Sequence, residues 1–180
     1  LATPQAFQSL AAADVDGDGQ RQLVGVTSGA GGATASLMVL SADQTTLALT
    51  QQSSTPLSVD GALNRIVSGD YDDNPVDDEV AVVASAAVTT TGPVSIQLYA
   101  FSGNPPAAML LDTTTLAVTG VNVLGAASGQ IHWFGVDGDA IVVGTAAPDG
   151  SQSVSILTTE QDQLVLQSST ALADNTIFAG

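Results

Sequence analysis

The sequence predicts an all-β domain that is built from three repeated units of four short antiparallel strands. Runs rich in Val, Ile, Leu and Thr alternate with Gly, Pro, Asn and Asp, which is typical of strands joined by turns. An acidic loop that leads into a β-branched strand also occurs three times, beginning at Asp14, Asp70 and Asp137. No long segment carries apolar residues at helical spacing between caps, so no helix is expected.

The acidic loops align the three units strand by strand. Each unit has one strand that enters the loop, one that leaves it, and two more. The strands predicted for the first unit are 7–13, 22–27, 36–40 and 46–51. Those for the second unit are 64–69, 79–84, 94–101 and 108–113. Those for the third unit are 130–136, 140–145, 153–157 and 163–167, with 116–129 expected to be a link between units.

Four short strands per unit are typical of the blades of a β-propeller. The units cover approximately residues 5–55, 64–117 and 130–171 of a single repeat domain, 1–180. Residues 175–180 align with 64–69 at Asn, Ile and Gly, so they are interpreted as the start of a further unit. Closed propellers typically have about four to eight blades, so these three propeller-type blades are expected to be part of a larger propeller or repeat array.

The composition restricts the classes of partner. The chain has 180 residues, of which 44% are hydrophobic, so it can bury a substantial core. Its net charge is −16 and its only basic residues are Arg21 and Arg65, which argues against nucleic acid and anionic membranes as partners. No apolar run is long enough for membrane insertion. The absence of Cys excludes disulfides, and the lack of Lys with abundant Ser, Thr, Gly and Ala indicates an extracellular or cell-surface protein.

The first acidic loop has the pattern of a cation site. Asp14, Asp16 and Asp18 stand at alternate positions, and Gly17 and Gly19 permit a tight turn. Ca²⁺ binds six to eight oxygen atoms, several of them anionic. Three carboxylates this close would also repel one another without a cation. The loop is therefore predicted to bind calcium.

The second acidic loop repeats the pattern, and the third repeats it poorly. The second loop offers a comparable set of oxygen ligands: Asp70, Asp72, Asn74 and Asp78. The third loop retains two acids, Asp137 and Asp139, which supply too few oxygens, so this loop is expected to be empty.

An acidic loop followed by a β-branched strand resembles the FG-GAP/VCBS repeats of integrin-α-like β-propellers. In that family, the loop binds Ca²⁺ through side chains at positions 1, 3 and 5, a carbonyl at 7 and an acid at 9. For the first loop, the resemblance implies the side chains named above and the carbonyl of Gln20, with Gln22 at position 9 in place of an acid. For the second loop, it implies the four side chains named above and the carbonyl of Val76, with Pro75 in place of the usual glycine. An EF-hand is excluded because Gly25 occupies position 12, where a bidentate Glu is required.

No catalytic constellation is recognisable, so an enzyme is not expected. The single histidine, His132, lies beside Trp133 and Phe134 in an apolar segment, where packing is the commoner role. No nucleophile elbow or phosphate-binding glycine loop is present.

The sequence thus favours an extracellular calcium-binding module that acts as a scaffold for adhesion or for recognition of a protein or carbohydrate ligand. Three alternatives remain open. The chain can be a self-assembling subunit of an extracellular polymer, a carbohydrate-binding domain, or an accessory domain of a secreted enzyme. Its partners can therefore include further copies of itself or further blades of a parent chain.

Overall fold

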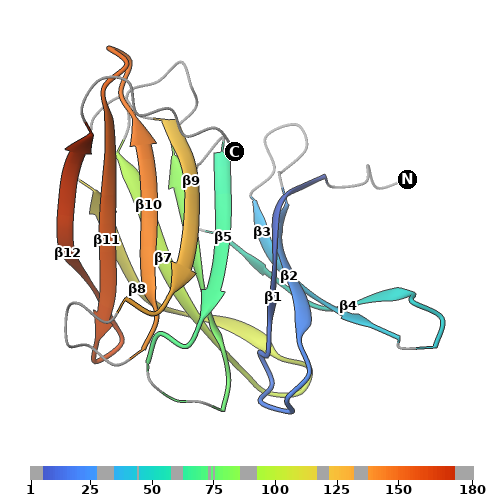
Figure 1. Cartoon of the computed structure of the whole chain (residues 1–180). Helices are drawn as coiled ribbons and strands as arrows, with labels where there is room; N and C mark the ends of the chain where they lie inside the picture. The colour runs from blue at the N-terminus through green and yellow to red at the C-terminus, as the bar shows by residue number, and fades with distance from the viewer. Residues whose placement is uncertain are drawn as a thin grey trace.

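A computed structural model describes most of the chain, and all of the described residues form strands, turns and loops (Figure 1). The described residues are 6–27, 35–43, 45–57, 63–72, 74, 76–85, 93–116, 122–131 and 138–172. The all-β prediction is confirmed, because these residues form three four-stranded antiparallel sheets and no helix. Accordingly, none of these residues belongs to a helix able to span a membrane.

Each sheet is a meander in which strands that follow one another in the chain are also neighbours. The first sheet consists of β1 (Phe7–Ala13), β2 (Gln22–Thr27), β3 (Ser36–Ala42) and β4 (Leu49–Pro56). The second sheet consists of β5 (Leu63–Gly69), β6 (Glu79–Ser85), β7 (Val94–Ser102) and β8 (Ala107–Leu116). The third sheet consists of β9 (Asn122–Gly129), β10 (Ala140–Ala146), β11 (Gln152–Glu160) and β12 (Gln163–Leu172).

Two predicted strands were wrong in position. Strand β4 begins at Leu49 rather than at Thr46 because Thr46 belongs to a turn. In this turn, the Asp43 carboxylate accepts hydrogen bonds from the backbone N–H groups of Thr45 and Thr46, at 2.9 and 2.7 Å. Such side-chain bonds offer the backbone an alternative to a sheet ladder.

The other misplaced strand is the first strand of the third sheet. The sequence predicted it at 130–136 and assigned 116–129 to a link, whereas β9 spans Asn122–Gly129. This strand contains two glycines and two alanines, which have low strand propensity, so pairing with β10 must supply its order. Residues 132–137 lie outside the described part of the chain.

The second sheet packs between the other two. Two apolar clusters fill its two sides, one shared with the first sheet and one with the third. Strand β6 is buried along its whole length because both of its faces are covered. The first strands lie closest together across the sheets, with β5 between β1 and β9 (Figure 1). The β1–β2 and β5–β6 loops, which carry the acids, therefore emerge side by side at the lower end of the molecule in this view.

Candidate metal centre

The first acidic loop brings three carboxylates together. Oxygen atoms of Asp14, Asp16 and Asp18 lie within 4.8 Å of one another. The chain reaches this shape because Gly17 and Gly19 adopt positive φ angles of 70° and 81°, which glycine tolerates best. The Asp14 Oδ2 atom accepts a hydrogen bond from the Gly19 N–H at 2.8 Å. In contrast, Asp14 Oδ1 is buried and has no hydrogen-bond donor among the described residues.

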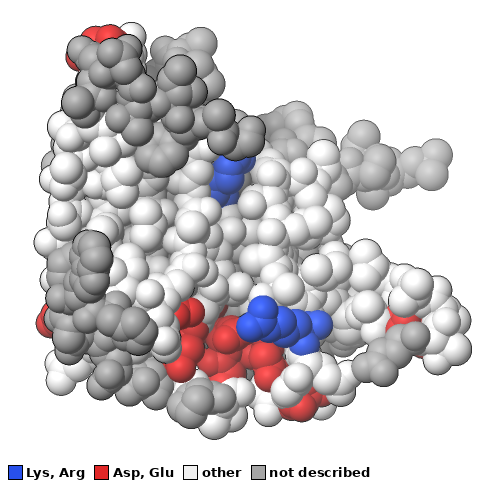
Figure 2. Space-filling view, in the orientation of Figure 1, with Lys and Arg blue, Asp and Glu red and all other residues white. Residues whose placement is uncertain are grey.

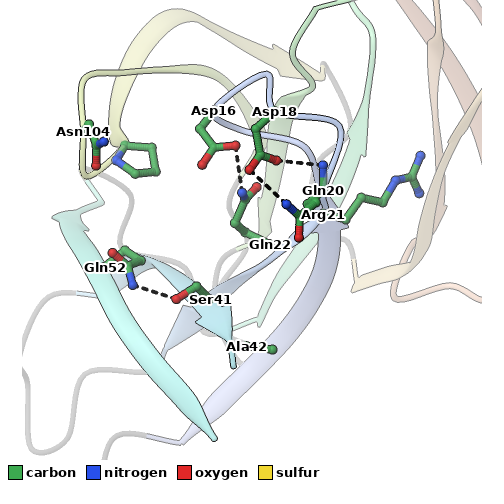
Figure 3. A pocket seen from close by; sticks show the side chains of 10 residues that line it. Asp16, Asp18, Gln20, Arg21, Gln22, Ser41, Ala42, Gln52 and Asn104 are labelled. Atoms are coloured by element: carbon green, nitrogen blue, oxygen red, sulfur yellow. Dashed lines mark hydrogen bonds between the residues drawn. The ribbon is translucent and has the colours of Figure 1, made fainter. Parts of the chain in front are cut away.

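Two glutamines surround this group. The Gln22 amide bridges the loop: its Oε1 accepts from the Val15 N–H at 3.0 Å and its Nε2 donates to Asp16 Oδ1 at 2.8 Å. Gln20, predicted as a carbonyl ligand, lies beside Asp18, whose Oδ1 accepts from the Gln20 N–H at 2.8 Å. Figure 3 shows the contacts of Gln22 with Asp16 and of Gln20 with Asp18, and it shows the Arg21 side chain directed away from Asp16 and Asp18.

The second acidic loop forms a similar group, but with a different third member. Oxygen atoms of Asp70, Asp72 and Glu79 lie within 4.8 Å of one another. Glu79 is only 1% exposed, and its Oε2 accepts hydrogen bonds from the N–H groups of Tyr71 at 2.8 Å and Asp72 at 3.3 Å. Burial raises the pKa of Glu79 to about 7, against the lowering effect of the hydrogen bond from Tyr71.

Sequence reasoning missed Glu79 because the second loop is one residue longer than the first. Strand pairing places Gln22 opposite Ala13 and Glu79 opposite Gly69, so Gln22 and Glu79 are equivalent. Both side chains accept a hydrogen bond from the second residue of their loop. Counting nine positions from Asp70 instead ends at Asp78. The available signal was the acid at the first position of the second strand.

Asp78 itself points toward the first loop. Its N–H donates to the Asp14 carbonyl at 2.7 Å, and its Oδ2 accepts from the Asp14 N–H at 2.9 Å. This reciprocal pair of hydrogen bonds joins the first two sheets at the site. The third loop repeats the first of these bonds, because the Asp139 N–H donates to the Asp70 carbonyl at 2.7 Å. Asp139 is thus the counterpart of Asp78.

Asn74 and Val76, the other predicted ligands, lie at the tip of the second loop. The Asn74 N–H donates to Asp72 Oδ1 at 2.8 Å, and its Nδ2 donates to Asp77 Oδ1 at 2.9 Å. Val76 is exposed, and its carbonyl oxygen approaches Gly17, where it would lie 3.1 Å from an added Cβ atom. The tip of the second loop therefore contacts the first loop. Of the acids of the third loop, Asp137 lies outside the described residues.

The lower end of the molecule is consequently crowded with negative charge (Figure 2). Burial, followed by the charges of Asp72, Asp14 and Asp78, raises the pKa of Asp77. A bound cation would relieve this repulsion.

A polar cavity of about 550 Å³ adjoins the first acidic loop (Figure 3). Asp16 and Asp18 form one side of it, and side chains of the first sheet and the β7–β8 turn form the rest. Gln52 Nε2 donates to Ser41 Oγ at 2.6 Å within this cavity, and Asn104 lies across from them. The cavity thus presents amides, a hydroxyl and carboxylates to a ligand.

His132, Trp133 and Phe134 lie outside the described residues. No protein-family model, curated protein or solved structure matches the chain.

Proposed function

We propose that the protein is an extracellular calcium-binding module whose acidic loops hold Ca²⁺ and brace the junction between its sheets. The observation that carries the proposal is the buried Oδ1 atom of Asp14, which has no hydrogen-bond donor among the described residues although two further carboxylates lie beside it. A buried anionic oxygen without a donor is costly, and a hard cation would compensate it. Asp14, Asp16 and Asp18 would hold the ion, with the Gln20 carbonyl as a further oxygen ligand.

A second ion would be held by Asp70, Asp72 and Glu79. The burial of Glu79 disfavours its ionised form, and calcium would stabilise that form. Asn74, Val76 and Asp78 complete the ligand set implied by the family resemblance; they would have to approach this group when the ion binds. Because Asp78 also bonds to Asp14, ions in the two loops would act on one shared junction.

The arrangement of the sheets supports propeller-type blades as the finer description of the fold. The three sheets are meanders, their first strands adjoin, and the acidic loop connects the first two strands of a sheet. The last of these features, the acidic loop, is the one on which the resemblance to FG-GAP/VCBS repeats rests. A rigid set of such blades would serve as an extracellular scaffold for adhesion or ligand recognition.

Thermal unfolding with and without calcium tests the proposal. We expect millimolar Ca²⁺ to raise the Tm relative to a chelator, by mass action worth about 2.7 kcal/mol per site at a hundredfold excess over Kd. Asp16→Asn, combined with Asp14→Asn, should remove the part of this shift due to the first loop. Asp162→Asn is the matched control, because Asp162 lies in the β11–β12 turn, belongs to neither group of carboxylates and has a φ of 61° that Asn tolerates. An identical Tm in chelator and calcium would refute the proposal.

The polar cavity favours a second candidate function, the binding of a neutral, hydroxyl-rich ligand such as a carbohydrate. Its amide and hydroxyl groups suit such a ligand, and an ion held by Asp16 and Asp18 would lie at its edge. A glycan array in calcium and in chelator tests this candidate. Binding that is lost in Gln52→Ala, with an unchanged Tm, would support it, whereas no glycan bound in either condition would reject it.

A further inference from the structure

The three sheets repeat one packing pattern along the chain. In each sheet, the last residue of the first strand pairs with the first residue of the second strand. This pairing makes three residues equivalent: Gln22, Glu79 and Ala140. From these positions, alternate residues of the second strand point to opposite faces of the sheet. We call one face the leading face; it carries Val24 and Val26 in the first sheet, and equivalently Ala81 and Val83, then Val142 and Gly144. The other is the trailing face; it carries Leu23 and Gly25 in the first sheet, and equivalently Val80 and Val82, then Ile141 and Val143.

Both interfaces inside the molecule join a leading face to a trailing face. Val24 and Val26 of the first sheet belong to one apolar cluster with Val80 and Val82 of the second. Ala81 and Val83 of the second sheet belong to the other cluster with Ile141 and Val143 of the third. The same head-to-tail packing therefore occurs twice, and it leaves one face of each kind without a partner sheet among the described residues.

The free leading face belongs to the third sheet. On the leading face of each of the first two sheets, the four central residues are at most 1% exposed. They are Val24, Val26, Val39 and Leu37 in the first sheet, and Ala81, Val83, Leu98 and Ile96 in the second. The equivalent positions of the third sheet are all partly exposed: Val142, Gly144, Ile156 and Val154. A shallow apolar groove of about 310 Å³ runs over this face beside Leu124, which is 42% exposed.

The free trailing face belongs to the first sheet. Phe7 and Leu10 are 42% and 51% exposed, and both lie over Gly25, where they occupy the space of the absent side chain. Leu10 pairs with Gly25 as Ile66 pairs with Val82 in the second sheet, yet Ile66 is buried against the first sheet. At the first strand of this face, an apolar surface that is covered in the second sheet is thus open in the first.

We propose that the leading face of the third sheet docks onto the trailing face of the first sheet of a second copy of this chain. At both internal interfaces, a trailing face covers a leading face. Each copy also carries one face of each kind that has no partner sheet among the described residues. Because the two docking surfaces differ, the contact is heterologous, and repetition produces either a closed ring or a filament. This assembly depends on sheet packing and goes beyond calcium binding, so a failure of either proposal leaves the other testable.

Two lysine variants test this inference by sedimentation velocity in about 150 mM salt, where charges are screened beyond about 8 Å. The wild-type mass should rise with concentration above the 17.9 kDa of one chain. Val154→Lys blocks the leading face and Leu10→Lys blocks the trailing face, so each variant alone should remain monomeric. A mixture of the two should form a one-to-one dimer and nothing larger, because one intact pair of faces remains. Each lysine also lowers the net negative charge, so charge repulsion does not account for a loss of association.

The matched control is Leu110→Lys in β8, which changes a leucine that is 45% exposed at the outer strand of the middle sheet and should associate like the wild type. Circular dichroism verifies folding, and Leu124→Lys and Phe7→Lys replace either variant that fails to fold. A wild-type chain that stays monomeric at every concentration overturns the proposal and points to another occupant, such as a further sheet of a longer polypeptide. Association that persists in both variants, or a mixture that stays monomeric, also overturns it.

Discussion

At the scale of single residues, the first residue of each second strand distinguishes the three loops. Gln22 places an amide in the first loop, Glu79 places a carboxylate in the second, and Ala140 places no polar group in the third. The two polar side chains perform the same structural task, because each accepts a hydrogen bond from the second residue of its loop. They differ in charge, and charge decides how strongly a calcium ion is held.

This comparison predicts the effect of Gln22→Glu. The new carboxylate can still accept from the Val15 N–H, but it can no longer donate to Asp16, and it adds a negative charge to the group. In chelator, we expect a loss of about 1–3 kcal/mol in the free energy of unfolding. In calcium, the extra anionic ligand should give a larger rise in Tm than in the wild type. A calcium-induced shift equal to or smaller than the wild-type shift would contradict the proposed site.

The raised pKa of Glu79 predicts that the stability of the fold depends on pH when calcium is absent. Its pKa is raised from 4.5 in the unfolded chain to about 7 in the folded chain, chiefly by burial, so the folded state binds the proton more tightly. The contribution of Glu79 to stability is therefore fully present below about pH 4.5 and is lost as the pH rises to about 7. Urea unfolding in chelator across this range should show the decline. Glu79→Gln should flatten this part of the profile, and a wild-type profile that rises instead would contradict the assignment.

At the scale of elements, the two acidic loops pack against each other as one unit. Gly17 makes this contact possible, because a Cβ atom there would lie 3.0 Å from Val76 Cγ1 and 3.1 Å from the Val76 carbonyl oxygen. The reciprocal hydrogen bonds between Asp14 and Asp78 also hold the two loops against each other. Loop geometry and sheet packing are consequently coupled at this end of the molecule.

Two glycine variants separate backbone strain from this contact. Gly17→Ala and Gly19→Ala both place alanine at a positive φ, which costs about 1 kcal/mol. Only Gly17→Ala also meets Val76, since nothing lies within 4 Å of a Cβ atom at Gly19. We therefore expect Gly17→Ala to lose about 1 kcal/mol more than Gly19→Ala in urea unfolding. Equal losses would show that the loop contact carries no energy.

At the scale of the whole molecule, stability is distributed over two interfaces between sheets rather than one central core. The second sheet contributes to both, which is why each position of β6 is buried. The outer sheets each pack one face against the second sheet, and their other faces have no partner sheet among the described residues. Equivalent residues in the repeat therefore differ in burial according to the place of their sheet in the stack.

Val24 and Val142 occupy equivalent positions and test this distribution. Val24 is fully buried between the first two sheets, whereas Val142 lies on the partly exposed leading face of the third. At concentrations low enough for a monomer, we expect Val24→Ala to cost about 2 kcal/mol and Val142→Ala less than about 1 kcal/mol. Chemical denaturation of both variants provides the comparison. A similar cost at both sites would mean that the leading face of the third sheet is covered within the single chain.

The sequence by itself determined the all-β class and the position of strands such as β2 and β6, because β-branched runs bounded by turn residues are local signals. It also located the groups of Asp14, Asp16 and Asp18 and of Asp70 and Asp72, since residues within one short loop are necessarily close. Strand β9 was missed because its glycines and alanines carry little local preference, and its order comes from pairing with β10.

Only the tertiary structure decided which acids meet across the loops. Because the second loop has an extra residue, the ninth position counted from Asp70 is Asp78, whereas strand pairing makes Glu79 the equivalent of Gln22. Glu79 therefore joins the group with Asp70, and Asp78 bonds to Asp14 instead. The two open faces likewise follow from the stacking order of the sheets. Val24 and Val142 look alike as residues of apolar strands, and only the presence or absence of a neighbouring sheet makes one of them core and the other surface.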